Sequence, residues 1–361
     1  MAKSKNIILI AVVAGVFVFL VGMAFLKPDL EYSKAERRML KQQPELSVES
    51  ILSGRYMSEF EAYSLDQFPF RDSFRGLKAI TSLKLDNNDL YVSNGSIVKM
   101  EYPLNEASLD RATDRFQNVY DLYLKDSGSD VYLSIVPDKN YFYAKDSGHL
   151  QIDYETLVSK MVTDNSYMTY VNIFPFLSGQ DYYLTDTHWK QEELVYVAEY
   201  LLETMGNKVE NQYQTVQMEG DFYGVYYGQA ALNLKPDKMK ILTNDTIKAL
   251  TVFDYENNKD IPVYELAKME EADPYELYVG GPVSLVTIEN PNANSEEELI
   301  VFRDSFGSSI APLLAQGYKK VTLVDIRYIQ PAMLGKFIDF KNKDVLFLYS
   351  TLVLNNSETL K

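Results

Sequence analysis

The strongest constraint on the fold comes from two short segments more than a hundred residues apart, Asp186-Thr187-His188-Trp189 and Arg303-Asp304-Ser305-Phe306-Gly307. Together they supply a carboxylate, an imidazole and a hydroxyl, which are the three groups of serine-based acyl transfer. The chain has two histidines, so the imidazole has few possible sources. A fold in which these groups act together must bring both segments side by side.

Serine is a poor nucleophile at neutral pH unless a nearby base takes its proton. Histidine suits that task because its ordinary pKa lies near neutrality. An aspartate can hold the imidazole ring and fix its tautomer. We therefore predict Ser305 as nucleophile, His188 as general base and Asp186 as orienting acid. In the alternative interpretation, Asp304 or Ser305 only caps a helix and His188 is a buried structural ring.

Composition excludes several classes of protein and site. The net charge of -16 argues against a nucleic-acid partner, which would need a basic surface. The absence of cysteine excludes a thiol nucleophile and a cysteine-ligated metal. The two histidines lie far apart and no carboxylate cluster has ligand spacing, so we expect no metal and no cofactor. We expect His149 to be an exposed turn residue.

The segment 7–26 is an uninterrupted apolar run that follows Lys3 and Lys5. About 20 residues at about 1.5 Å each match a hydrocarbon core of about 30 Å. The run is longer than the apolar part of a cleaved signal peptide. We predict an uncleaved signal anchor over residues 1–28. The basic residues before it place the N-terminus in the cytoplasm and the remainder outside the cell membrane.

Strand-like and helix-like segments alternate in the rest of the chain, which predicts an α/β sandwich with a mostly parallel sheet. We expect helices at 107–124, 191–205 and 308–316 and strands at 131–136, 167–173, 298–302, 320–324 and 344–349. Residues 29–105 are expected to be a membrane-proximal helical segment, with an amphipathic helix within 60–83, that packs on a main domain over 106–361. The region around 207–297 resembles an inserted lobe.

The predicted site has a position that suits this fold. Sites in open α/β sheets lie beyond the carboxyl ends of the strands. Ser305 lies just after one predicted strand and before a predicted helix. The N-terminus of that helix would offer backbone N–H groups and partial positive charge to an oxyanion.

Further motifs occur along the chain in a recognisable order: Tyr32-Ser33, Glu36-Arg37-Arg38, Asp66-Gln67-Phe68-Pro69-Phe70-Arg71, Val136-Pro137-Asp138-Lys139, Asp273-Pro274-Tyr275, Gly280-Gly281 and Asp325-Ile326-Arg327-Tyr328. With the two segments above, they resemble the DHHW family. These are membrane-anchored bacterial proteins related to the alginate O-acetyltransferases. Thr187 stands where the family's Asp-His-His-Trp motif has its first histidine.

The resemblance implies an SGNH-hydrolase-like three-layer α/β/α sandwich that carries the same Ser305, His188 and Asp186 triad. It implies acetyl transfer to a hydroxyl of a cell-surface or secreted polysaccharide, with a membrane-bound O-acyltransferase as possible partner for the acetyl donor. Arg327, Trp189 and Lys139 become candidates for contact with substrate or oxyanion. For Arg327 the alternative is an ion pair with Asp325, and for Trp189 it is a core anchor. The only oxyanion donor we assign is the backbone N–H of Ser305.

Two other functions stay open. An O-acetylesterase would use the same triad and differ only in its final acceptor, which is water. A non-catalytic polysaccharide-binding or scaffold protein would need no triad at all. A large separation between Ser305 and His188 would favour that last class.

Overall fold

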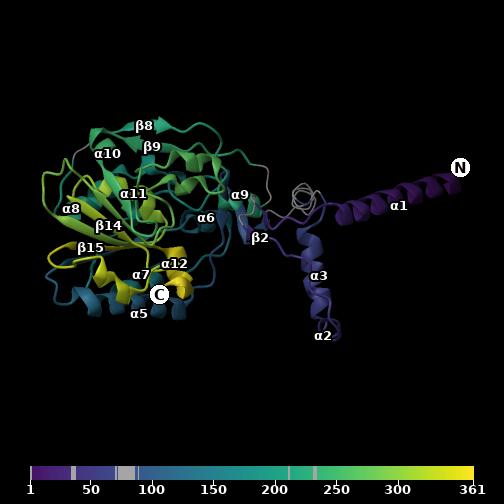
Figure 1. The fold of residues 1–361 in the computed structure, drawn as a ribbon, viewed down its shortest axis with the longest axis horizontal. Helices are drawn as coiled ribbons and strands as arrows, with labels where there is room; N and C mark the ends of the chain where they lie inside the picture. Colours follow the sequence, from purple (N-terminus) through teal and green to yellow (C-terminus); the bar gives the residue numbers. More distant parts are fainter. Residues whose placement is uncertain are drawn as a thin grey trace. The chain divides into compact units, whose positions relative to one another are not determined.

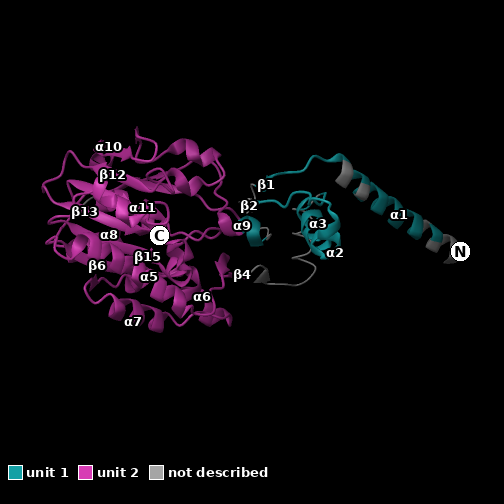
Figure 2. Cartoon of the chain, turned by 60° about the horizontal axis from the view of Figure 1, so that its bottom comes forward, with its two compact units in different colours: residues 1–88, 227–233 teal, residues 89–226, 234–361 magenta. Residues whose placement is uncertain are grey.

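The computed structural model describes residues 2–33, 38–69, 71, 86–87, 89–209, 212–230 and 234–361. The chain forms two compact units (Figure 2). The first contains residues 1–88 and 227–233, and the second contains residues 89–226 and 234–361.

The first unit contains helices α1 (Ala2–Leu26), α2 (Val48–Leu52) and α3 (Arg55–Asp66) and the short strands β1 (Tyr32–Ser33), β2 (Arg38–Met39) and β3 (Asp86–Asn87). Helix α1 covers the predicted anchor segment. Judged by length and hydropathy, no helix in the described ranges could cross a membrane. Helix α3 covers the start of the predicted amphipathic helix, and residues 72–85 lie outside the described residues.

The motif that begins at Asp66 holds together chain segments of this first unit. Gln67 donates through Nε2 to the carbonyls of Leu30 and Lys41, and its Oε1 accepts from the Leu30 N–H. Asp66 accepts from the backbone N–H of Lys41 and lies 3.6 Å from the Arg71 guanidinium. These side chains satisfy backbone groups that have no secondary-structure partner.

The second unit is built on an eight-stranded sheet of order β11-β10-β12-β14-β13-β15-β6-β7. Its strands are β6 (Asp130–Val136), β7 (Thr169–Tyr170), β10 (Thr251–Asp254), β11 (Lys259–Ile261), β12 (Leu285–Glu289), β13 (Glu298–Arg303), β14 (Lys320–Val324) and β15 (Asp344–Ser350). The five strands from β14 to β7 pair in parallel, and β11, β10 and β12 extend the sheet by antiparallel pairing. The fold is therefore mixed α/β with a large, mostly parallel sheet, as predicted.

Helices cover both faces of this sheet (Figure 1). The helices of this unit are α5 (Glu106–Val119), α6 (Lys139–Ser147), α7 (Tyr154–Asp164), α8 (Val195–Thr204), α10 (Asp245–Ala249), α11 (Phe306–Leu314) and α12 (Thr351–Asn355), and α9 is Val225–Ala230. Side chains of β13 alternate between two cores. Leu299 and Val301 join the core under α8 and α11, while Ile300 and Phe302 join the core under α5 and α7. Two apolar faces explain why the strand reads as a continuous apolar run.

The prediction of a helical segment over 29–105 is wrong at residues 90–99. Strands β4 (Leu90–Ser93) and β5 (Ser96–Lys99) form an antiparallel hairpin. Its turn is Asn94-Gly95, and both residues have positive φ, 49° and 79°. Asn-Gly between apolar pairs is a strong hairpin signal, because both central positions of a type I′ turn need positive φ. The hairpin joins the second unit, which begins at residue 89 rather than 106.

The region 207–297 is also not a separate lobe. It contributes a small antiparallel pair, β8 (Gln214–Gln217) and β9 (Lys240–Thr243), but β10, β11 and β12 continue the central sheet. The predicted strand 167–173 is reduced to two residues, β7, at the sheet edge. An edge strand has one neighbour, so fewer backbone hydrogen bonds extend it.

Candidate active site

Ser305 lies in the turn between β13 and α11, and it is partly exposed. It occupies the N-cap position of α11, yet its hydroxyl makes no capping hydrogen bond. The hydroxyl oxygen lies 2.8 Å from Nε2 of His188. Capping falls to Asp304, whose Oδ1 accepts from the Phe306 N–H at 3.0 Å. The capping interpretation therefore holds for Asp304 and leaves Ser305 available to His188.

Asp186 and His188 form a local turn that orients the imidazole. Oδ1 of Asp186 accepts from the His188 backbone N–H at 3.0 Å and lies 2.6 Å from Nδ1 of the ring. The spacing of two residues is that of an Asx turn. A carboxylate only accepts, so Nδ1 carries the proton and Nε2 accepts from the Ser305 hydroxyl. Asp186 is fully buried and His188 is 8% exposed.

A third chain segment holds Asp186 from the other side. Oδ2 of Asp186 accepts from the backbone N–H of Val225 at 2.8 Å. The residue before it, Gly224, donates to the Thr185 hydroxyl at 2.9 Å. A Cβ added at Gly224 would lie 2.2 Å from Cβ of Asp186, so only glycine allows this approach. The sequence offered one weak signal for this contact, a glycine within an aromatic stretch, and it was missed.

Tyr275 stacks on the imidazole and was assigned no role from the sequence. The ring centroids of Tyr275 and His188 are 3.8 Å apart and the planes differ by 6°. The Tyr275 hydroxyl donates to Oγ of Ser309 at 2.7 Å, which fixes the ring on the α11 side. Burial raises the pKa of Tyr275 well above its ordinary value, so the ring stays neutral beside His188. The stack restricts rotation of the imidazole out of line with Ser305.

Trp189 and Arg327 make structural contacts. The fully buried Trp189 donates through Nε1 to the Phe306 carbonyl at 3.1 Å and to Oγ of Ser309 at 2.9 Å. These contacts correspond to the core-anchor alternative. Arg327 makes a bidentate ion pair with Asp325, at 2.9 Å and 2.7 Å. This contact corresponds to the ion-pair alternative for Arg327.

Lys139 lies inside the protein and joins two segments next to the site. It is 2% exposed, and its Nζ donates to Oγ of Ser96 in the hairpin and to the carbonyls of Tyr183 and Leu184. Burial lowers the pKa of Lys139 to about 7, against the opposing effect of the Asp186 carboxylate. Its described contacts tie the hairpin to the strand-like segment that leads into Asp186.

Two further observations bear on the chemistry. Within the described ranges, no group of three or more His, Asp or Glu side chains could hold a metal ion. His149, expected to be an exposed turn residue, is half-buried and stacks on Tyr91 at 3.7 Å. The structure therefore brings together Asp186, His188 and Ser305, and it places the second histidine in a separate aromatic contact.

The chain combines a mixed α/β fold with a hydrogen-bonded Asp, His and Ser cluster. It therefore belongs to the class of α/β proteins that have a candidate serine-dependent site at the carboxyl edge of the sheet. Residues 153–324 match the model of the DHHW protein family, which confirms the resemblance predicted from the sequence. No curated protein matches the sequence.

Three solved structures are also similar to this chain. A DHHW family protein from Eubacterium siraeum has a TM-score of 0.58 at 19% identity, covering 76% of this chain and 97% of that one. Bacillus cereus PatB1 has a TM-score of 0.58 at 18% identity, covering 73% and 96%. The O-acetyltransferase domain of Pseudomonas putida AlgJ matches at a TM-score of 0.45 and 13% identity, covering 74% and 92%. The first two show that the fold is shared.

We predict that Gly224→Ala displaces Asp186 and breaks its hydrogen bond to His188. The added Cβ overlaps Asp186, and a shift of about 1 Å is enough to misalign such a cluster. The measurement is the far-downfield proton resonance of His188 Nδ1, which should disappear. Gly15→Ala is the control, because no atom lies within 4 Å of its Cβ position and its backbone is outside the positive-φ region. Persistence of the resonance in Gly224→Ala would contradict the assigned role.

We predict that Lys139 makes the stability of the full-length chain depend on pH. Its folded pKa, about 7, lies below its unfolded value, about 10.4, so the unfolded state binds more protons between these values. The free energy of unfolding should therefore rise with pH in this window, by up to about 1.4 kcal/mol per pH unit. Urea unfolding from pH 6 to pH 10 should show this slope in the wild type and in the control Lys145→Met. Lys139→Met should lack it, and an unchanged slope in that variant would refute the prediction.

Proposed function

We propose that this chain is an O-acetyltransferase that works through an acyl-enzyme on Ser305. The observation that carries the proposal is the continuous hydrogen-bonded series from Asp186 through His188 to Ser305, with separations of 2.6 Å and 2.8 Å. This arrangement can activate a serine, because the Ser305 hydroxyl donates to His188 and the His188 ring donates to Asp186, as proton transfer requires.

The first half-reaction would form the acyl-enzyme. Oγ of Ser305 attacks the acetyl carbonyl of the donor while Nε2 of His188 takes its proton. Asp186 holds the ring and stabilises the imidazolium that results. The negative oxygen of the tetrahedral intermediate would face the Ser305 N–H at the N-terminus of α11. Collapse of the intermediate expels the donor's leaving group, which takes the proton from His188.

The second half-reaction would transfer the acetyl group. A hydroxyl of the acceptor gives its proton to His188 and attacks the acyl carbonyl, and Ser305 leaves as the free hydroxyl. The resemblance to the DHHW family supports a polysaccharide as acceptor. It also supports attachment to the cell membrane through residues 1–28, an extracytoplasmic site and a membrane-bound O-acyltransferase as source of the acetyl group.

An O-acetylesterase is the second candidate, because Ser305 is partly exposed and water could reach the acyl-enzyme. A purely non-catalytic protein is disfavoured, since it gives no reason for the alignment of His188 on Ser305.

We predict that Ser305→Ala and His188→Ala each lower the release of p-nitrophenol from its acetate by about a thousandfold or more. The reason is that each removes one end of the proton transfer to the nucleophile. The sulfonyl adduct solved for Bacillus cereus PatB1 suggests a second readout. A sulfonyl fluoride should add one sulfonyl group to this chain at Ser305, as seen by peptide mass spectrometry. Ser295→Ala is the control and should keep activity and labelling. Wild-type turnover in Ser305→Ala would end the proposal.

We predict that the wild-type chain acetylates an oligosaccharide when an acetyl ester donor is supplied. A transferase protects its acyl-enzyme for the sugar hydroxyl, so acetylated sugar should exceed free acetate. Mass spectrometry of the sugar and quantification of acetate measure the two products. Free acetate alone, at a rate unaffected by the sugar, would assign the chain to the esterases.

A further inference from the structure

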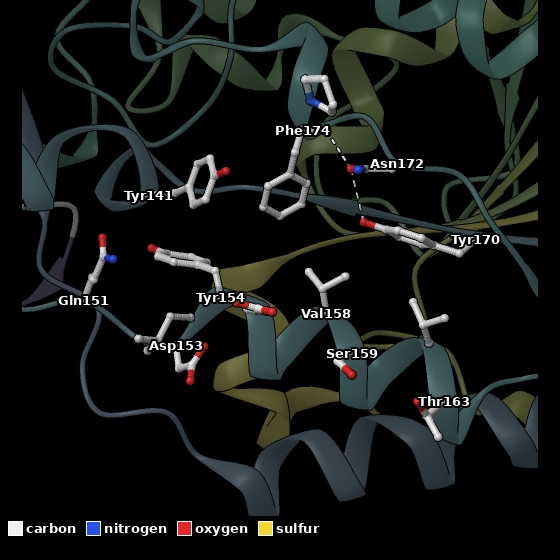
Figure 3. Close-up of a pocket in the computed structure, with 14 residues that line it drawn as sticks. Tyr141, Gln151, Asp153, Tyr154, Val158, Ser159, Thr163, Tyr170, Asn172 and Phe174 are labelled. Atoms are coloured by element: carbon white, nitrogen blue, oxygen red, sulfur yellow. Dashed lines mark hydrogen bonds between the residues drawn. The ribbon is translucent and has the colours of Figure 1, made fainter.

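The second unit has a large hollow that is separate from the triad. Its volume is about 1040 Å³, and it lies between helix α7 and the segment 170–175, with Tyr141 of α6 at one end (Figure 3). Asp186, His188 and Ser305 are not among the residues that line it. Its size is that of a site for a drug-sized or larger ligand.

Aromatic rings with accessible surface line the hollow. Tyr141 is 38% exposed, and its ring meets those of Tyr154 and Phe174 edge-on, with centroids 5.0 Å apart and interplanar angles of 80° and 81°. In Figure 3 the three rings surround one end of the hollow. Edge-to-face packing places the edge of one ring against a face of its partner, which holds the rings in place. Tyr154 is buried, whereas the exposed Tyr141 and the half-buried Phe174 offer apolar ring surface to a ligand.

Uncommitted polar groups lie beside these rings. Asn172 accepts through Oδ1 from the Phe174 N–H at 3.1 Å, which leaves its amide nitrogen without a partner among the described residues. The side chains of Gln151 and Ser159 also line the hollow, and neither has a hydrogen-bond partner in the described part of the chain. Amide and hydroxyl groups next to flat apolar surface suit a molecule that presents hydroxyls at its edge and C–H groups on its face.

The charge of the lining restricts the ligand. The described lining residues include two carboxylates, Asp153 and Glu155, and no Lys, Arg or His. Hydrogen bonds from the backbone and hydroxyl of Thr156 lower the pKa of Asp153, so it is ionised at neutral pH. A polyanion would meet uncompensated negative charge here.

Hydrogen bonds connect the lining of the hollow to the edge of the sheet that holds Ser305. The Tyr154 hydroxyl donates to both oxygens of Asp138, at 3.0 Å and 2.9 Å, and Asp138 lies two residues after the end of β6. Thr351 donates to the same carboxylate at 2.7 Å, and its neighbour Ser350 donates through N–H to Asp304. One end of the hollow therefore lies at the carboxyl ends of β6 and β15, the edge where sites of such sheets form.

We propose that this hollow binds an uncharged oligosaccharide segment and serves as a subsite for the acceptor polysaccharide. The acceptor role rests on the proposed function, whereas binding by itself does not require catalysis. Sugar rings would stack on Tyr141 and Phe174, and their hydroxyls would pair with Asn172 and Gln151. The carboxylates select against chains of uronic acids.

Calorimetric titration of the full-length Ser305→Ala chain tests this proposal, because that variant cannot turn over an ester. The probes are cellohexaose and N-acetylchitohexaose, which are uncharged, and hexagalacturonate, which is anionic and of equal length. At least one uncharged probe should bind, and hexagalacturonate should bind at least about tenfold more weakly at low salt. In the same background, Tyr141→Ala and Phe174→Ala should each weaken binding by about tenfold. Tyr196→Ala, at a tyrosine that is 76% exposed, is the matched control and should bind as its parent does.

Further measurements keep folding, charge and catalysis apart. Thermal unfolding establishes that each variant is folded, and Phe174→Tyr, which keeps a ring, should restore binding lost in Phe174→Ala. Asp153→Asn with Glu155→Gln should reduce the discrimination against hexagalacturonate. Failure of both uncharged probes to bind, unchanged affinity in both alanine variants, or a preference for hexagalacturonate would overturn the proposal. If the oligosaccharide binds but the wild type does not hydrolyse the ester, only the proposed function is refuted. If the wild type hydrolyses the ester but no oligosaccharide binds, only the subsite is refuted.

Discussion

The carboxylate of Asp186 is the interaction on which the candidate site depends. One oxygen accepts from the backbone and the ring of His188, and the other accepts from the Val225 N–H. A fully buried carboxylate needs such partners, because desolvation of an unpaired charge is costly. The same contacts that make its burial tolerable also set the plane and the tautomer of the imidazole. Gly224 makes the third contact possible by letting the backbone approach without a side chain in the way.

The carboxyl edge of the sheet places the nucleophile opposite this acid and base. Asp304 caps α11 and ties the turn to the end of β15. Asp138, after β6, is a second buried carboxylate, and desolvation raises its pKa while hydrogen bonds from Thr351 and Tyr154 oppose that effect. Buried polar networks of this kind are rigid when every member is satisfied. A rigid edge keeps Ser305 aligned with His188. It also fixes Tyr154, which lines the hollow.

Sequence patterns predicted the elements whose signals are local. Apolar runs of β-type residues marked β6, β13, β14 and β15 to within about two residues, because strands buried on both faces carry little else. Asp186, two residues before His188, was expected to hold the imidazole, and in the structure it contacts both the backbone and the ring of His188. The hairpin at Asn94-Gly95 was missed although its signal is local too, since a charged and helix-prone neighbourhood outweighed it. The region 207–297 was wrongly predicted to be a lobe, because amino-acid composition does not show which strands pair when they are far apart in the sequence.

The sequence by itself therefore determined the chemistry available: one acid and imidazole pair, one serine after a strand, no thiol and an acidic surface. It also determined the class of fold, because alternating strand and helix patterns depend on neighbouring residues. Only the tertiary structure decided that His188 reaches Ser305, that Val225 and Tyr275 hold the acid and the ring, and that Trp189 and Arg327 are already paired. Those contacts join residues separated by long stretches of chain. Their formation depends on how whole elements pack, which no short window of sequence encodes.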